Sequence, residues 1–204
     1  MKPEQRILEA AGELFYRHGI KSITMDAIAS HLGMSKRTIY DSYEDKHAIV
    51  KALTKLELDS QEKQLDQIRK LSDNSIDEIM RTMSCVGNIF ERITPALFYD
   101  LQKFHKDAWK QFRSFKEQKI QLFIEENLKR GIKQGLYRKD LQVKILARLR
   151  IEEVEMGFSP SIFPQSKFNL SEVQMVLIDH FLHGIVTLKG HKLINKYKKV
   201  TEDE

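Results

Sequence analysis

Residues 24–40 read TMDAIASHLGMSKRTIY, and this stretch decides the fold. Its first half has the apolar spacing of a short helix, which the hydroxyl of Thr24 can cap. Gly33 is suited to end that helix because glycine adopts a left-handed backbone at little cost. Ser35 can cap a second short helix that extends to about Ser42. Two short helices joined by a glycine turn predict a helix-turn-helix.

The segments on either side of this stretch are also expected to be helical. Apolar residues at helical spacing predict a helix over residues 3–18, with Pro3 in its first turn and Gly19 as its end. After the stretch, we expect a long helix that begins at Glu44 or Asp45 and continues to about residue 70. Its many charges among regularly spaced apolar residues are typical of a connecting helix.

The rest of the chain alternates between helical patterns and short breaks. Ser75 and Glu78 have the spacing of a capping box, for a helix that ends near residue 93. Pro95 marks a helix start and Gly135 a helix end. We expect further helices over residues 96–104, 107–134, 141–156 and 169–197, with a loop over residues 157–168. About nine helices in all predict an all-α protein.

Composition agrees with a helical protein and excludes several classes. The chain has 204 residues, 41% of them hydrophobic, with only four prolines and nine glycines. Its single cysteine, Cys85, cannot form an internal disulfide, and no signal-peptide pattern opens the chain. No apolar run approaches the roughly 20 residues of a membrane helix. We therefore expect a cytoplasmic protein without a membrane segment.

Net charge alone does not indicate a function. The chain carries a net charge of +5, but residues 1–50 contain seven Lys and Arg against seven Asp and Glu. A nucleic-acid partner must therefore be argued from the placement of particular cations. The first turn of the second short helix holds Ser35, Lys36, Arg37 and Thr38, and Tyr40 lies one turn further on. This is where a recognition helix meets base edges and phosphates.

Spacing alone leaves a second interpretation open, an ordinary helix–helix corner within a bundle. The residues themselves favour DNA binding. Lys36 and Arg37 lie at the exposed start of a helix, where cations oppose the helix dipole and a phosphate backbone would offset that penalty. Lys46 stands where a backbone phosphate would pass.

Thr24 through Lys46, above all the run GMSKRTIY at residues 33–40, resembles the tetracycline-repressor (TetR) family. The resemblance covers about the first quarter of the chain. It implies a DNA-binding domain at residues 1–48 and a helical ligand-binding and dimerisation domain at residues 49–204. It further implies that helix N-termini at Thr24 and Ser35 hold phosphates, while Lys36, Arg37, Thr38 and Tyr40 face the major groove.

The resemblance also implies a homodimer on a palindromic operator of double-stranded DNA, repression, and release by a small-molecule inducer. The chain departs from the family pattern at Asp41 and Ser42, where an aromatic residue followed by His is common, so phosphate contact there is not expected. Tyr43 occupies a position that is usually a core Phe, and we expect it to pack in the core.

The C-terminal part contains candidate pocket and interface residues. Met and aromatic side chains adapt to apolar ligands, although such a stripe also fills a core. The candidate pocket residues are Met83, Phe90, Phe98, Tyr99, Trp109, Phe112 and Phe123. In the family, the last two large helices pair with their copies in a dimer, and burial within one subunit is the alternative. The candidate interface residues are Leu146, Leu149, Val173, Leu177, Phe181, Gly184 and Leu188.

Other functions find less support in the sequence. There is no glycine-rich phosphate loop, zinc-protease motif or nucleophile elbow, so we expect neither an enzyme nor a cofactor. Asp179, His180 and His183 lack a further clustered ligand, so we expect no metal site. A helical interaction or ligand-binding protein without DNA binding is the main alternative. The basic stretch Lys189–Lys199 fits a solvated helix end, and nucleic acid or a membrane surface is its other interpretation.

Overall fold

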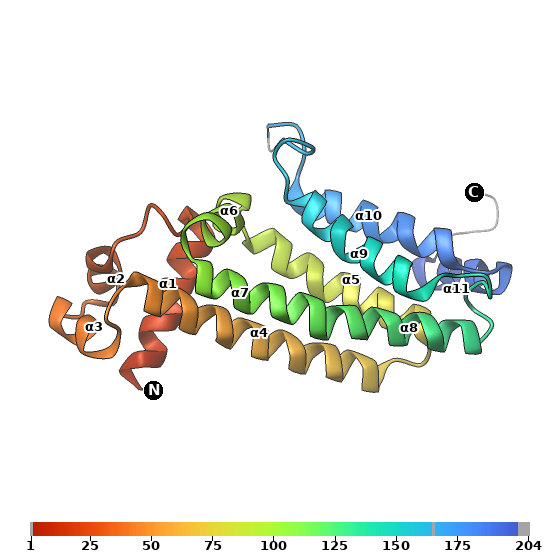
Figure 1. Ribbon diagram of the computed structural model, residues 1–204, viewed down its shortest axis with the longest axis horizontal. Helices are drawn as coiled ribbons and strands as arrows, with labels where there is room; N and C mark the ends of the chain where they lie inside the picture. Colours follow the sequence, from red (N-terminus) through yellow and green to blue (C-terminus); the bar gives the residue numbers. More distant parts are fainter. Residues whose placement is uncertain (1, 165, 200–204) are drawn as a thin grey trace. The chain divides into compact units, whose positions relative to one another are not determined.

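The computed structural model describes residues 2–164 and 166–199, and the fold in these ranges is all-α, as predicted. The helices are α1 (Pro3–His18), α2 (Met25–Leu32), α3 (Lys36–Ser42), α4 (Lys46–Leu71), α5 (Ser75–Arg92), α6 (Pro95–Phe104), α7 (Lys106–Phe115), η1 (Lys116–Ile120), α8 (Gln121–Lys133), α9 (Val143–Gly157), α10 (Leu170–Ile185) and α11 (Leu188–Lys198) (Figure 1). All are α-helices except η1, a short π-helix.

The chain forms two compact units. The first contains residues 1–61 and 92–115, and the second contains residues 62–91 and 116–204. The predicted domain boundary at residue 48 is drawn by function and stays a prediction. The first unit includes the start of α4 and also α6 and α7, which are far from the helix-turn-helix in sequence.

In the first unit, α1, α2 and α3 share a core with the start of α4. Ile7 of α1, Ile28 of α2, Ile39 of α3 and Ile49 of α4 have no solvent exposure. Leu101 of α6 joins this core, as does Ala108 of α7. Because each of these helices buries only one face, the others are needed to cover it. The helix-turn-helix therefore rests on α6 and α7 as well as on α1 and α4.

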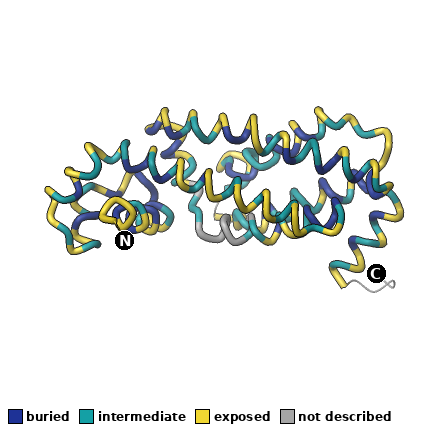
Figure 2. Tube along the Cα trace, turned by 90° about the horizontal axis from the view of Figure 1, so that it is seen from below, coloured by how far each residue is buried: buried dark blue, intermediate teal, exposed yellow. Residues whose placement is uncertain are grey.

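In the second unit, α10 packs against α9, and α9 against α8. Figure 1 shows the blue and cyan helices α10 and α9 side by side. The core contains Leu128, Tyr137, Leu182 and Ile194, all fully buried. The tube in Figure 2 alternates between buried and exposed residues along most helices, as expected for helices that each cover part of a core.

The predicted helix boundaries agree with the structure for α1, α2 and α3, but the predicted capping box at Ser75 is wrong. The side chain of Asn74, one residue earlier, accepts hydrogen bonds from the backbone N–H groups of Ile76 and Asp77, both at 3.0 Å. The carboxylate of Glu78 instead lies in the core, where the side chain of Asn127 donates to it at 2.8 Å. Asn74 and Ser75 are both short polar residues that can cap a helix, so the sequence pattern alone did not distinguish which of them caps α5.

The predicted single helix over residues 169–197 is also wrong, because the structure divides it into α10 and α11. Val186 is extended, and the hydroxyl of Thr187 accepts a hydrogen bond from Gly190 N–H and so caps α11. The Thr187 N–H donates to the carbonyl of Leu136 at 2.9 Å. This contact is distant in sequence, so helical periodicity does not reveal the break. Similarly, the predicted helix 107–134 is α7, η1 and α8 in succession.

Candidate nucleic-acid interface

The helix-turn-helix has the caps that its sequence predicts. The Thr24 hydroxyl accepts a hydrogen bond from Ala27 N–H at 3.1 Å, and the Ser35 hydroxyl accepts one from Thr38 N–H at 3.1 Å. Gly33 is left-handed, with φ 62° and ψ 28°. Met34 N–H then donates to the carbonyl of Ala29 at 3.0 Å, which completes the turn. These bonds fix the direction in which α3 leaves α2.

The outer face of α3 presents the predicted DNA-contacting side chains to solvent. The Arg37 side chain is 91% exposed and Tyr40 is 51% exposed. Ser35 and Lys36 are also exposed, whereas Thr38 is partly buried and its hydroxyl lies 2.9 Å from that of Ser35. On the opposite face, Ile39 is fully buried. The helix therefore shows one polar face with two cations, a phenol and hydroxyl groups, all of which can donate to an anion.

Both cations of α3 have a carboxylate beside them. The Lys36 ammonium lies 2.5 Å from the carboxylate of Asp26 on α2, and the Arg37 guanidinium lies 4.0 Å from that of Asp41. All four side chains are more than half exposed. The ion pair between Asp26 and Lys36 was not predicted from the sequence, because the two residues are ten positions apart. The Asp41 side chain is 71% exposed.

Lys46 has a different set of partners from the one that its sequence position suggests. Its ammonium donates to the carbonyls of Ile20 and Ile23 at 2.9 and 2.8 Å, in the turn between α1 and α2. Burial lowers its pKa, and Asp100 opposes that effect. The side chain therefore fastens the turn that precedes α2, and its contact with a phosphate stays a prediction.

Helix α6 fastens the same turn from another side. The carboxylate of Asp100 accepts a hydrogen bond from Lys21 N–H at 2.7 Å and is almost fully buried. A methyl group built on Gly19, which has φ 78°, would lie 3.3 Å from this carboxylate. The position that orients α2 and α3 is thus held by side chains of both α4 and α6. Asp100 has no motif around it in the sequence, so this contact was not predicted.

A pair of histidines, buried His105 and exposed His47, lies next to Lys46 and Asp100. The rings of His47 and His105 are tilted, with centroids 4.5 Å apart, and His105 Nδ1 has no hydrogen-bond partner among the described residues. Burial, then the nearby His47 and Lys46, lower the pKa of His105 to about 4, against opposing effects of Asp100 and Asp45. His105 is therefore neutral near pH 7. Burial, together with Glu4, also raises the pKa of Tyr43, which packs against the core as expected.

The predicted pocket residues lie in both units. Phe98, Trp109 and Phe112 form a cluster in the first unit, with ring centroids 5.0–5.4 Å apart. Tyr99 is half exposed, and Lys103 donates to its hydroxyl. In the second unit, Met83 and Phe123 are buried, and the Arg69 guanidinium lies 4.7 Å from the Phe123 ring centroid. The side chain of Phe90 lies outside the described residues. The pocket stays a prediction.

The predicted interface residues divide into two groups. Leu149, Gly184 and Leu188 are exposed, and Leu146 and Leu177 are partly buried. Val173 and Phe181 are only 7% exposed in the single chain, and the assignment of all seven residues to an interface stays a prediction. Ile145 of α9 is 66% exposed and Val176 of α10 is 61% exposed. Together with Leu149 and Gly184, these two residues give α9 and α10 several exposed apolar positions, and the exposed ion pair of Arg148 and Glu152 lies among them on α9.

The remaining candidate side chains have ordinary surroundings. Burial raises the pKa of the Cys85 thiol, whose sulfur lies 3.4 Å from Gln64 Oε1. The carboxylate of Asp179 binds Lys198 and lies 3.7 Å from His183 Nε2. Within residues 2–164 and 166–199, no three His, Cys, Asp or Glu side chains are grouped to hold a metal ion. No helix in these ranges is both long and apolar enough to span a membrane.

Comparisons with known proteins agree with a DNA-binding helix-turn-helix in this part of the chain. Residues 7–53 match the family model of the bacterial regulatory proteins of the tetR family. Over 184 residues, the chain is 24% identical to an uncharacterised HTH-type transcriptional regulator, YvaF, of Bacillus subtilis. This alignment covers 89% of the chain and 95% of that protein. The family-model match to residues 7–53 includes all seven residues predicted to contact DNA.

Solved structures share the whole fold. A tetR-family transcriptional regulator from Agrobacterium tumefaciens aligns with a TM-score of 0.75 at 15% identity, over 91% of this chain and 98% of that one. A regulator from Saccharomonospora viridis, solved in complex with choline, aligns with a TM-score of 0.71 at 18% identity, over 90% of this chain and 97% of that one. The family model matches the part of the chain that contains the helix-turn-helix, and together with the relative and the shared fold it makes the chain similar to DNA-binding transcriptional regulators of the tetR family.

Proposed function

We propose that this regulator binds a palindromic DNA operator as a homodimer and represses transcription until a small, apolar ligand releases it. The recognition helix is α3, which contacts bases through Lys36 and Arg37. Thr38 and Tyr40 contribute further major-groove contacts, and the caps Thr24 and Ser35 place helix N-termini at phosphates. In this proposal the protein has no enzymatic role and acts in the cytoplasm.

The observation that carries the proposal is the cationic outer face of α3. Two exposed cations in the first turn of α3 oppose the helix dipole, so packing of the helix alone does not explain them. Asp26 and Asp41 hold these cations in the free protein. Exposed ion pairs contribute about 0–1 kcal/mol, so phosphates or bases can replace the carboxylates at little cost.

The exposed aliphatic residues of α9 and α10 support a dimer. Exposed aliphatic side chains at Ile145, Leu149 and Val176 lose contact with water when two copies meet. Gly184 has open space where a side chain would extend, which permits close approach of a second helix. A two-fold dimer carries two copies of α3, and its operator therefore has two related half-sites.

Helix α4 is the element that we expect to transmit ligand binding. It begins in the core of the helix-turn-helix at Ile49 and continues to Arg69, whose guanidinium stacks on the predicted pocket residue Phe123. A ligand that displaced this ring would act directly on α4. It would release DNA only if it bound the DNA-free arrangement more tightly than the bound one. The choline complex of the similar regulator supports a small ligand in this fold.

The test is selection of bound duplexes from a random pool, using purified full-length protein. We expect one palindromic sequence to be enriched and the double variant Lys36→Ala/Arg37→Ala to lose that preference. If no sequence is enriched by a folded protein, the regulator proposal fails in favour of a helical interaction protein. A single unrepeated site bound by a monomer would overturn the dimer but not the DNA contact.

A further inference from the structure

Helix α11 carries more positive charge than its place in the fold requires. Residues 188–199 contain five lysines and no acidic residue. Lys189, Lys192 and Lys196 are spaced by three and four residues, which places them on one face of α11, and Lys199, three residues further on, is the left-handed residue that caps its end. At 1.5 Å per residue the row extends about 15 Å. We call these four residues the lysine row.

The opposite face of α11 is fixed in the core of the second unit. Ile194 is fully buried, and the Tyr197 hydroxyl accepts a hydrogen bond from Asn74 at 2.9 Å. Gly190 lies so close to Leu136 that an added Cβ would be 2.4 Å from the Leu136 carbonyl oxygen. The orientation of α11 is therefore set by packing, and all four lysines of the row are exposed.

Most of the lysine row has no acidic partner among residues 2–164 and 166–199. Lys189 donates to the carbonyl of Gln134 at 3.3 Å, while Lys192, Lys196 and Lys199 form no ion pair with any described residue. The adjoining turn between α8 and α9 adds the exposed cations Lys133, Arg138 and Lys139. Backbone bonds from Thr187 to Leu136 and from Arg138 to Ile185 hold this turn beside the start of α11 (Figure 1).

The helix dipole accounts for only part of the row. Cations near a helix C-terminus stabilise it, which explains Lys196 and Lys198 in the last turn of α11. Lys189 lies in the first turn, where a cation opposes the dipole. Lys192 and Lys196 are four residues apart, so their like charges repel. A polyanion would relieve both effects.

From these observations we infer that the lysine row is a second, sequence-independent contact for the phosphate backbone of duplex DNA, separate from α3. Lysine is a flexible point charge that can meet phosphates without a fixed geometry, whereas arginine prefers bidentate recognition. Closely spaced cations along about 15 Å suit a backbone with one negative charge per roughly 1.7 Å of duplex axis.

The structure favours duplex DNA over a membrane or a protein as the partner of the lysine row. A membrane-bound helix needs an apolar face to enter the lipid, but the apolar face of α11 is buried and only Leu188 remains exposed beside the row. Protein interfaces depend on a desolvated aromatic or aliphatic centre, which the row does not have. Phosphate contacts need neither feature.

The experiment measures the affinity for a duplex of scrambled sequence over a range of salt concentrations, in the full-length Lys36→Ala/Arg37→Ala background. That background removes the cations of α3, so the outcome does not depend on whether the proposed operator exists. We expect residual binding that weakens about tenfold when Lys192→Glu/Lys196→Glu is added. The slope of log affinity against log salt should decrease by about two, because each lost phosphate contact contributes about 0.9.

Two controls separate the lysine row from net charge. Lys63→Glu/Lys70→Glu changes the same number of exposed lysines on α4 and should leave most of the binding intact. Lys192→Arg/Lys196→Arg keeps the charge and should bind like the parent. Equal loss in the α4 variant would overturn the inference, as would an unchanged slope in the α11 variant. Sedimentation with phosphatidylglycerol vesicles, in the absence of duplex binding, would also overturn it in favour of a membrane surface.

Discussion

Individual residues around α3 are already partly ordered on the surface that we propose to contact DNA. The carboxylate of Asp26 holds the Lys36 ammonium against α2, and Ser35 and Thr38 hold each other at the start of α3. Side chains that are already partly ordered lose less entropy on binding DNA. The same carboxylate repels phosphates, so it weakens binding to a backbone without the right base beside it.

This balance predicts the effect of Asp26→Asn. The substitution frees Lys36 and removes a negative charge that faces the DNA, so affinity for a duplex of scrambled sequence should increase about two- to fivefold, within the usual energy of an exposed pair. Filter binding of the scrambled and the selected duplex measures both affinities, and the ratio between them should fall. Asp59→Asn, an exposed change on α4, is the control. An unchanged ratio would show that Asp26 has no part in selectivity.

The burial of His105 should make the free energy of unfolding depend on pH. Its pKa is lowered from 6.5 to about 4 by burial and by the nearby His47 and Lys46. The unfolded chain therefore takes up this proton before the folded chain does. Stability is complete above about pH 6.5 and is lost as the pH falls toward 4, by at most roughly 3 kcal/mol.

The measurement is urea unfolding at pH 7 and pH 5, followed by circular dichroism. His105→Leu should be less sensitive to this change in pH than the parent protein, while His18→Gln on the exposed end of α1 should behave like the parent. If the parent and His105→Leu lost equal stability between the two pH values, another group would be responsible.

At the residue level, the sequence predicts the caps of the recognition site but not the partners of its cations. Thr24, Gly33 and Ser35 act through backbone groups within three residues, so local pattern rules apply to them. Asp26 and Asp100 act on groups 10 and 79 residues away. Lys46 was predicted from its position to meet a phosphate, but its carbonyl partners depend on how α1 and α4 pack.

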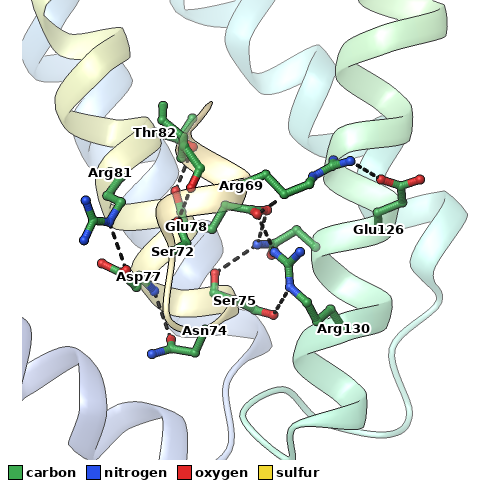
Figure 3. A network of polar contacts seen from close by, with 12 residues as sticks. Arg69, Ser72, Asn74, Ser75, Asp77, Glu78, Arg81, Thr82, Glu126 and Arg130 are labelled. Carbon is green, nitrogen blue, oxygen red and sulfur yellow. Dashed lines mark hydrogen bonds and ion pairs between the residues drawn. The ribbon is translucent and has the colours of Figure 1, made fainter. Parts of the chain in front are cut away.

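Among the elements, the start of α5 is held by polar rather than apolar contacts. The carboxylate of Glu78 is fully buried and pairs with the Arg130 guanidinium of α8, as Figure 3 shows. Asn127 donates to Glu78 and also to the carbonyl of Ser75 at 2.9 Å. The Tyr137 hydroxyl donates to that carbonyl at 3.0 Å. Burial and the negative charge of Glu78 raise the pKa of Tyr137, so the phenol stays neutral.

This network predicts a large effect of Glu78→Ala. The substitution removes the buried carboxylate that pairs with the Arg130 guanidinium and accepts a hydrogen bond from the Asn127 amide, so the free energy of unfolding should decrease by about 3–5 kcal/mol. Urea unfolding measures it. Glu126→Ala is the matched control, because Glu126 pairs with Arg69 but its carboxylate is 42% exposed. That change should cost about 1 kcal/mol or less, and equal costs would show that burial does not set the strength of these pairs.

Sequence periodicity predicts most elements because a helix that buries one face repeats its apolar residues every three or four positions. It located α1 to α3 within a residue or two and failed where a helix is interrupted without a proline. Thr187 divides the last predicted helix through bonds to Gly135 and Leu136, about 50 residues earlier. The π-helical segment η1 likewise begins at Lys116, whose buried ammonium pairs with Glu155 of α9. Neither partner is visible in a local window.

For the whole molecule, the proposed dimer links the exposed aliphatic residues of α9 and α10 to the proposed recognition helix α3 by symmetry. A single copy of α3 makes few base contacts, so useful affinity requires that a second copy bind the same duplex. Ile145 and Val176 stay in water in the isolated chain, an arrangement that association would relieve. Dimerisation and operator binding should therefore fail together.

The variant Leu149→Arg/Val176→Arg tests that link. Both side chains are about half exposed or more, so the substitutions should leave the fold intact while they place like charges on each side of a two-fold interface. Analytical ultracentrifugation should show a monomer, and affinity for the selected duplex should fall at least tenfold, although α3 is unchanged. Leu122→Arg, an equally exposed change on α8, should do neither. A monomeric variant that still bound the full palindrome tightly would mean that one copy of α3 suffices. A variant that remained dimeric would place the interface on another surface of the chain.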